Sequence, residues 1–322
     1  MNPIKPTFYN AARDRMPEGM RPSPFTDRAD WLGQGELTFA VSNGFPSTLG
    51  HTLVLPRDFG TYRFTDLARD ELVEHFRMFK TLTAAFNAHF KPDGYNVGWN
   101  IGFHGGQSIA HAHMHIMPRY NTVNRAHKIN PLGGLVRMPF QSIPDFYNTA
   151  SKSAQRTLEK HVTTMMPLVA RNDLAYAVNL PRDVAVAQGH SVVLPHAPRK
   201  SLLDCSEGEF LAQLELALEI MAMQQAGTTP PDGYNIGWDV GRAGGQMMSR
   251  AYLHVLPRYA GDMDSPRGGI VRLIPQAAWP NNTDYYDAKN VGKDVVLKDI
   301  VTFPFDFWDS PSRSNVMDLK PV

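Results

Sequence analysis

The order of apolar and polar positions in the first 120 residues predicts a unit of short strands and one long helix. Apolar runs bounded by glycine and proline are typical of strands, and apolar residues three or four positions apart are typical of one helix face. The helical spacing runs from about residue 66 to residue 90, with Thr65 or Asp66 as the expected N-cap. The expected strands are Leu37–Ser42, Thr52–Leu55, Tyr95–Ile101 and Ile109–Met117. This order predicts an α+β unit built on an antiparallel sheet.

The same pattern returns 139 positions later, which indicates an internal repeat. Residues 94–120 and 233–259 agree at 14 of 27 positions without a gap, and Gly50–Pro56 matches Gly189–Pro195 at the same offset. We therefore expect two domains, at residues 1–145 and 146–322. We also expect a connecting helix at about residues 145–168, and an aromatic tail after about residue 275 that packs back on the body.

Composition restricts the class of protein. The chain has 322 residues, a formal net charge of +1, 43% apolar residues and one cysteine, Cys205. Nothing in this balance favours a nucleic-acid partner, and no run approaches the roughly 18 apolar residues of a membrane span. A single cysteine fits a reducing compartment. We expect a cytoplasmic protein with neither a nucleic-acid nor a membrane partner.

The candidate chemistry lies in His111-Ala112-His113-Met114-His115. Side chains alternate along a strand, so the three imidazoles are expected on one face. A glycine-rich loop, Gly102–Gln107, precedes them and can offer backbone N–H groups to an anion. A neutral imidazole can act as nucleophile, proton donor or relay, so this pattern favours phosphoryl or nucleotidyl transfer.

Two other interpretations remain. The histidines could be structural, although three on one face bring many polar nitrogens into a core. His-x-His on a strand is also a common metal-ligand pattern, to which His51 could add a ligand. No aspartate or glutamate lies near the segment to complete or orient such a site.

Residues His111–Met117 resemble the His-φ-His-φ-His-φ-φ signature of the histidine-triad (HIT) family, where φ is apolar. Gly105–Ser108, Asn100-Ile101-Gly102 and Gly50-His51 are similar to further family motifs. The similarity spans roughly residues 23–140 and, weakened, 168–275. Pro118-Arg119-Tyr120 makes the chain look more like the dinucleoside-polyphosphate hydrolases of the family than its phosphoramidases.

The resemblance implies roles for individual residues. His113 is expected to attack the α-phosphorus of a nucleotide, giving a nucleotidyl-histidine that water resolves. His115 is expected to contact the phosphate and help deliver a proton, with His111 and His51 fixing tautomers. The expected nucleotide-binding residues are Asn43 at the ribose and Asn100, Gly106, Gln107 and Ser108 at the phosphate. No cofactor is expected. Ser23-Pro24-Phe25-Thr26 replaces the family's zinc-binding Cys-Pro-Phe-Cys, so no metal is expected.

The second copy has lost most of this pattern. Only the last histidine of the triad is retained, as His254. The replacements are His111 by Arg250, His113 by Tyr252, Asn100 by Asp239 and Ser108 by Met247. A tyrosine with a pKa near 10 is a poor nucleophile at neutral pH, so we expect a non-catalytic copy. Because HIT proteins form homodimers with a joined sheet, the resemblance implies a monomeric pseudo-dimer with a continuous sheet. Further oligomerisation is left open.

The leading hypothesis is a nucleotide hydrolase acting on dinucleoside polyphosphates, nucleoside phosphoramidates or similar adenylylated small molecules. The alternatives are a nucleotidyltransferase with a phosphorylated acceptor, a nucleotide-binding or sensing protein, and a metal-dependent hydrolase. Transferases of the family typically replace the third histidine with glutamine. His115 therefore favours water as the acceptor.

Overall fold

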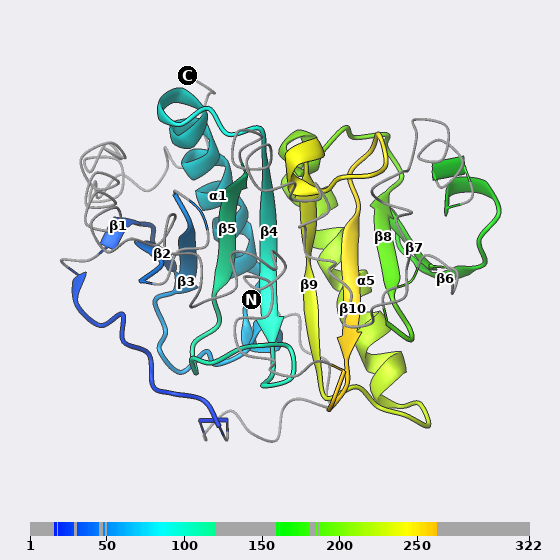
Figure 1. The fold of residues 1–322 in the computed structure, drawn as a ribbon, viewed down its shortest axis with the longest axis horizontal. Helices are drawn as coiled ribbons and strands as arrows, with labels where there is room; N and C mark the ends of the chain where they lie inside the picture. The colour runs from blue at the N-terminus through cyan, green and yellow to red at the C-terminus, as the bar shows by residue number, and fades with distance from the viewer. Residues whose placement is uncertain are drawn as a thin grey trace.

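The computed structural model describes residues 16–17, 19–28, 31–44, 48, 50–119, 159–160, 162–180, 185 and 187–262. The described residues form one ten-stranded sheet in the order β1-β2-β3-β5-β4-β9-β10-β8-β7-β6 (Figure 1). Both long helices, α1 and α5, lie behind the sheet as Figure 1 shows it. The predicted α+β class with an antiparallel sheet is confirmed.

The first half of the sheet follows the predicted element order with one addition. Its strands are β1 (Trp31–Gln34), β2 (Thr38–Ser42), β3 (Thr52–Pro56), β4 (Gly94–Ile101) and β5 (Met114–Arg119). A 3-10 turn (Phe64–Asp66) and helix α1 (Arg69–His89) lie between β3 and β4. Strand β1 was not predicted, because its sequence, WLGQ, has no clear alternation of apolar and polar residues.

The second half repeats this arrangement. Its strands are β6 (Leu168–Arg171), β7 (Ala175–Asn179), β8 (Ser191–Pro195), β9 (Gly233–Val240) and β10 (Leu253–Arg258). Its helical elements are Leu202–Asp204, α5 (Glu207–Gln225) and Arg242–Gly244. Each half therefore has the same strand order, ending at the central pair β4 and β9.

Two predicted boundaries are wrong. The expected N-cap residues Thr65 and Asp66 belong to the 3-10 turn, and α1 begins after Ala68, whose N–H donates to the Glu71 carboxylate at 2.6 Å. The strand expected from Ile109 begins only at Met114. The reason is that the N–H groups of Ala110 and Ala112 donate to the carbonyls of Arg21 and Thr61, so this backbone does not join the sheet ladder.

Several sequence expectations fall outside the described residues. These are the aromatic tail after about residue 275 and most of the connecting helix at 145–168, of which residues 159–160 and 162–164 are described as helical. No helix in the described part of the chain is both long and apolar enough to cross a bilayer.

The two halves meet where β4 pairs antiparallel with β9, from Tyr95↔Val240 to Ile101↔Tyr234. Gly98 faces Gly237 at the centre of this pairing. A Cβ added to Gly98 would clash with the Ile236 carbonyl oxygen and lie 2.7 Å from the Gly237 Cα. The close approach of the two strands therefore requires glycine at this position.

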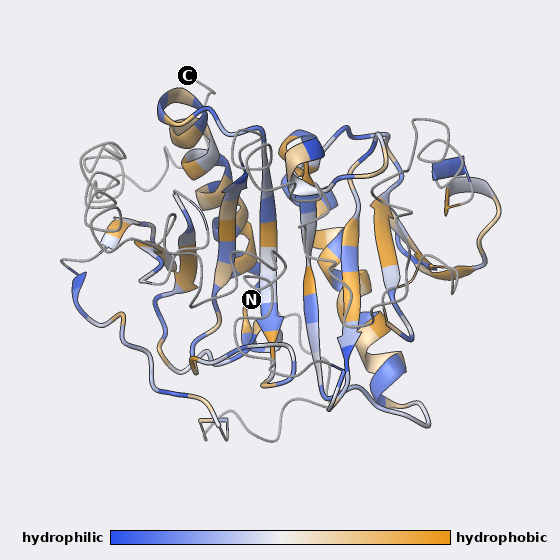
Figure 2. Ribbon diagram, in the orientation of Figure 1, coloured by the Kyte–Doolittle hydropathy of each residue, from blue (hydrophilic) through white to orange (hydrophobic). Residues whose placement is uncertain are grey.

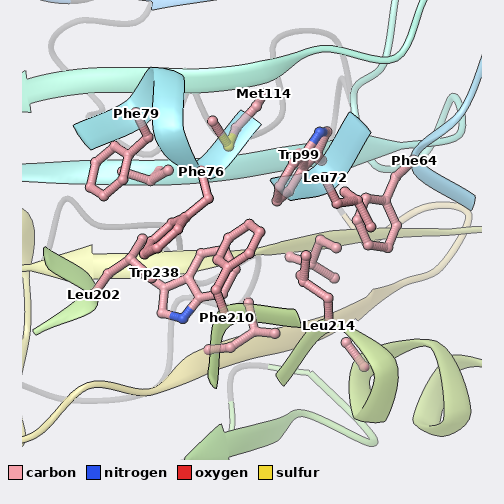
Figure 3. Packing of buried hydrophobic residues seen from close by; sticks show 14 of the residues in the cluster. Phe64, Leu72, Phe76, Phe79, Trp99, Met114, Leu202, Phe210, Leu214 and Trp238 are labelled. Carbon is pink, nitrogen blue, oxygen red and sulfur yellow. The ribbon is translucent and has the colours of Figure 1, made fainter. Parts of the chain in front are cut away.

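One apolar cluster crosses this junction. Phe76 of α1 stacks on Phe210 of α5 with ring centroids 4.6 Å apart, and Phe210 stacks on Trp238 of β9 at 5.2 Å (Figure 3). Apolar and polar residues are interspersed along the central strands (Figure 2). One face of the sheet can thus bury apolar side chains against the helices while the other carries polar groups.

Candidate active site

The four predicted catalytic histidines gather near the start of β5, but not as a row on one strand. Only His115 lies in β5, while His111 and His113 belong to the irregular segment before it. The His113 and His115 rings are 4.9 Å apart between centroids, and His115 lies 5.3 Å from His51. The expectation that strand alternation aligns all three triad rings is therefore wrong, although His113, His115 and His51 do lie together.

One ring nitrogen of His113 is fixed by a hydrogen bond. Its Nδ1 lies 2.7 Å from the His111 carbonyl oxygen. A carbonyl can only accept, so Nδ1 carries the proton and Nε2 keeps its lone pair. Within the described part of the chain, no protein group hydrogen-bonds to Nε2. Burial lowers the pKa of His113, against the opposing effect of the hydrogen bond to His111. His113 is therefore neutral near pH 7.

His111 supports His113 through its backbone while its own ring is fixed on both sides. Its Nε2 donates to the Pro56 carbonyl at 2.8 Å, and its Nδ1 lies 2.9 Å from the Ser23 hydroxyl, which therefore donates. Burial lowers the pKa of His111 to about 4. Ser23, which the sequence marked only as a lost zinc ligand, is thus a partner of the triad.

His51 and His115 form a neutral, hydrogen-bonded pair. His51 Nε2 and His115 Nδ1 are 3.0 Å apart. Burial, with smaller effects from Arg119 and His113, lowers the pKa of His51 to about 3. Burial, followed by the effects of His113 and His51, lowers the pKa of His115 well below its usual value. The Nδ2 of Asn43 lies 3.1 Å from His51 Nε2, which places the predicted ribose ligand beside this pair.

The glycine-rich loop presents fewer free groups than predicted. Gly106, at a φ of +91°, donates its N–H to Phe103. The N–H of Gln107 donates to the Gly102 carbonyl. The side-chain Nε2 of Gln107 donates to the carbonyls of Tyr62 at 2.6 Å and Ile109 at 3.1 Å.

These bonds change the role expected of Gln107 and Gly106. Both side-chain amide hydrogens of Gln107 are already donated, so the prediction that this amide holds phosphate oxygens does not fit. Its equivalent, Gln246, makes the corresponding bonds to Gly241, Lys200 and Met248. The glutamine therefore braces the loop in both copies, and Ser108 is left as the loop residue closest to the predicted role.

Asn100 lies between the two halves of the sheet. Its Nδ2 is 3.3 Å from His115 Nε2, and its Oδ1 accepts from Asn235 Nδ2 at 2.8 Å. Asn235 was not predicted as a site residue. The available signal was the repeat itself, since Asn96 and Asn235 stand at equivalent positions of GYNVGWN and GYNIGWD.

The degenerate site of the second copy keeps the framework but not the nucleophile. His190 Nε2 and His254 Nδ1 are 3.0 Å apart, as in the first copy. Arg250 donates to the Pro195 carbonyl at 2.6 Å, replacing the bond from His111 to Pro56. The Tyr252 hydroxyl accepts from the backbone N–H of Met247 at 2.9 Å.

Among the described residues, no three side chains of His, Cys, Asp or Glu are grouped so as to hold a metal ion. The contact between His51 and His115 is a hydrogen bond between ring nitrogens.

Comparison with known proteins assigns part of the first half of the chain to a domain family. A family model described as HIT domain matches residues 26–122. Residues 26–122 form a domain of the histidine-triad family. The chain is 31% identical over 103 residues to bis(5'-adenosyl)-triphosphatase of Saccharomyces cerevisiae, covering 32% of this chain and 47% of that enzyme. The chain thus matches about half the length of this curated relative.

Two further relatives are similar to part of the chain. A bis(5'-adenosyl)-triphosphatase of Dictyostelium discoideum is 26% identical over 141 residues, covering 42% of this chain and 83% of that protein. Among solved structures, the C. elegans NitFhit protein is 30% identical with a TM-score of 0.30, covering 32% of this chain and 25% of that one.

Proposed function

We propose that this chain is a nucleotide hydrolase that acts at the α-phosphorus through a covalent nucleotidyl-histidine on His113. The observation that carries the proposal is the 2.7 Å bond from His113 Nδ1 to the His111 carbonyl. It leaves the lone pair on Nε2, the nitrogen that has no partner in the described part of the chain. A neutral, oriented imidazole is the form that can attack phosphorus.

In the first step, Nε2 forms a bond to the α-phosphorus and the leaving group departs with the electron pair of its bridging oxygen. The bonded imidazole then carries a positive charge, which the His111 carbonyl oxygen at Nδ1 stabilises. In the second step, water attacks the same phosphorus and returns the electron pair to Nε2. His115, whose ring neighbours that of His113, is placed to contact the phosphate and to exchange a proton with water.

A contact in the second copy supports a position for the phosphate oxygens. There, the Met247 N–H points at an oxygen atom carried by Tyr252. By the repeat, Met247 corresponds to Ser108 and Tyr252 to His113. The Ser108 N–H would then face an oxygen on a phosphorus bound to His113. Together with Asn100 Nδ2, it would supply donors for charge that develops in the transition state.

We also infer that residues 1–145 form the catalytic domain and residues 146–322 a non-catalytic domain, joined as a monomeric pseudo-dimer. The β4–β9 pairing and the shared apolar cluster support this organisation. The names of the two triphosphatase relatives favour bis(5'-adenosyl) triphosphate as a substrate to test first. Nucleoside phosphoramidates and other adenylylated small molecules remain the comparison set.

Hydrolysis in ¹⁸O-labelled water tests the proposal. Bis(5'-adenosyl) triphosphate should yield AMP and ADP, with the label in AMP, because water attacks the phosphorus held by His113. Label found mainly in ADP, or no hydrolysis of any compound in the set, would overturn the proposal. Adding sugar phosphates to the same reaction distinguishes transfer, since a transferase would form a nucleotidyl sugar at the expense of labelled AMP.

A further inference from the structure

The junction between β4 and β9 carries a hydrogen-bonded chain that runs from the second copy into the first site. Arg258 Nη1 donates to Asn235 Oδ1 at 2.8 Å. Asn235 Nδ2 donates to Asn100 Oδ1 at 2.8 Å and to the Gly105 carbonyl at 2.7 Å. Asn235, Asn100 and Arg258 are all at most 5% exposed. Asn235 of the second copy thus contacts two parts of the first site, the side-chain amide of Asn100 and the glycine-rich loop at Gly105.

The partners at the start of this chain determine every amide orientation along it. A guanidinium can only donate and a backbone carbonyl can only accept. Asn235 must therefore turn its oxygen to Arg258 and its nitrogen to Gly105. The second hydrogen of the same nitrogen is donated to Asn100, which must accept it with its side-chain oxygen. The Asn100 nitrogen is left facing His115.

The geometry points to Asn235 as a positioning residue for the first site, acting from the second copy through Asn100. This inference rests on the proposed function. If the Asn100 amide were inverted, a carbonyl oxygen would face the phosphate in place of an N–H donor, and an oxygen acceptor there repels an anion. The non-catalytic copy therefore contributes a residue without which the donor in the first site loses its orientation.

The same chain reaches the histidine pair. In the free protein, the Asn100 nitrogen donates to His115 Nε2 at 3.3 Å. His115 then carries its proton on Nδ1 and donates to His51 Nε2 at 3.0 Å. The tautomer of His115 is thus a readout of the Asn100 orientation that requires no substrate.

The junction supplies its own control. Asn96, the equivalent of Asn235, accepts from Arg119 and donates to Asp239 at 2.7 Å and to the Gly244 carbonyl at 2.6 Å. It is equally buried and makes the same set of contacts, but toward the degenerate site. Asn96→Ala and Asn235→Ala therefore remove matched bonds from opposite sides of one junction.

Kinetics on this pair test the positioning role. Asn235→Ala should lower kcat for bis(5'-adenosyl) triphosphate about 10- to 100-fold, less than the roughly 100- to 1,000-fold loss seen when a transition-state donor is removed outright. KM should stay within about 3-fold. The two substitutions should lower the melting temperature by similar amounts. Asn96→Ala should nevertheless keep kcat within about 2-fold of the parent. Equal kcat values for the two variants would overturn the inference.

Nitrogen-15 NMR of the histidine rings in the free protein tests it without substrate. His115, assigned by comparison with His115→Gln, should be the Nδ1–H tautomer in the parent protein. Asn235→Asp is isosteric, keeps the acceptor for Arg258 and removes the donor to Asn100, so the Asn100 amide should invert and His115 should change to the Nε2–H tautomer. An Nε2–H tautomer in the parent, or an unchanged Nδ1–H tautomer in Asn235→Asp, would overturn the inference. A parent protein that shows the expected tautomers but hydrolyses nothing would instead reject the proposed function.

Discussion

The His113 imidazole donates its Nδ1 proton to the backbone carbonyl of His111, 2.7 Å away. The backbone of residues 109–113 precedes β5 and lies outside the sheet ladder, which makes this contact possible. The His111 ring is meanwhile fixed by Ser23 and Pro56. The main-chain carbonyl of His111 thus orients the His113 ring. Nε2 of that ring is the nitrogen required for the proposed attack on phosphorus.

Replacing the proposed nucleophile should separate turnover from binding. His113→Ala or His113→Asn should lower kcat by about four orders of magnitude, because no other group can form the covalent intermediate. The dissociation constant of a non-hydrolysable analogue, measured by calorimetry, should change by less than about 10-fold, or 1.4 kcal/mol. Tyr252→Phe, at the equivalent position of the second copy, is the control and should retain full activity. Residual turnover within 10-fold of the parent would be incompatible with a nucleophilic His113.

The acid limb of the rate profile should lie below the range of an ordinary histidine. Activity requires a neutral His113, whose pKa is lowered by burial from its usual 6.5. We expect kcat/KM to stay flat as the pH falls through 6.5 and to decline only at lower pH. After correction for ionisation of the substrate itself, a decline in kcat/KM centred at or above pH 6.5 would contradict the structure.

Stability should also depend on pH through these buried rings. The folded pKa of His51 is about 3 and that of His111 is about 4, both below the usual 6.5 of an unfolded chain. The unfolded state therefore binds more protons as the pH falls, so this stabilisation is complete above about pH 6.5 and is lost toward pH 3–4. Scanning calorimetry should show a melting temperature that decreases steadily below pH 6.5. An unchanged melting temperature between pH 7 and 5 would show that these rings are not buried as neutral groups.

One mismatch between the copies predicts a stabilising substitution. The buried Trp99 Nε1 has no hydrogen-bond partner among the described residues, and its neighbour on α1 is His75. In the second copy, Trp238 Nε1 donates to Gln213 at 3.0 Å. His75 Nδ1 and Gln213 Nε2 both contact the carbonyl of a glutamate four residues earlier, so the two side chains are equivalent.

His75→Gln should therefore supply an acceptor for Trp99 and raise the free energy of unfolding by about 1 kcal/mol. Urea denaturation followed by tryptophan fluorescence measures this change. Gln213→His is the reverse control and should destabilise by a similar amount. Destabilisation by His75→Gln would mean that the imidazole makes a contact that glutamine cannot replace.

The junction glycine predicts a steric effect. Gly98→Ala places a Cβ against the Ile236 carbonyl and 2.7 Å from the Gly237 Cα. We expect a loss of about 2–3 kcal/mol in the free energy of unfolding, as for other overpacked positions. Gly44→Ala, where an added Cβ meets nothing within 4 Å, should change it by less than about 0.5 kcal/mol. Equal effects of the two substitutions would show that the strands do not approach each other so closely.

The repeat and the apolar periodicity predicted most of the fold. Pairs such as Gly94–Asn100 and Gly233–Asp239 indicated two copies, and both segments lie in equivalent strands, β4 and β9. Strand β1 was missed because apolar periodicity is weak in four residues. The start of β5 was also misplaced, because the pattern of His111 to His115 is periodic while its backbone bonds go to Arg21 and Thr61, distant in sequence.

The sequence predicted which residues gather at the candidate site better than it predicted their contacts. The sequence identified His113, His115 and His51, which lie together. It could not show that the Gln107 amide is occupied by main-chain carbonyls, because glutamine suits a loop brace as well as a phosphate ligand. The repeat marked Asn235 as the equivalent of Asn96, but its contact with Asn100, 135 positions away, follows only from the β4–β9 pairing.

Trapping the intermediate is the most direct test of the central claim. The protein is mixed with bis(5'-adenosyl) triphosphate, denatured within milliseconds at alkaline pH to preserve an acid-labile P–N bond, digested and analysed by mass spectrometry. The proposed mechanism predicts one adenylyl group on His113, absent from His113→Ala and from the peptide that contains Tyr252. Hydrolysis without any adenylylated histidine under conditions that capture a single turnover, or an adduct on a residue other than His113, would contradict it.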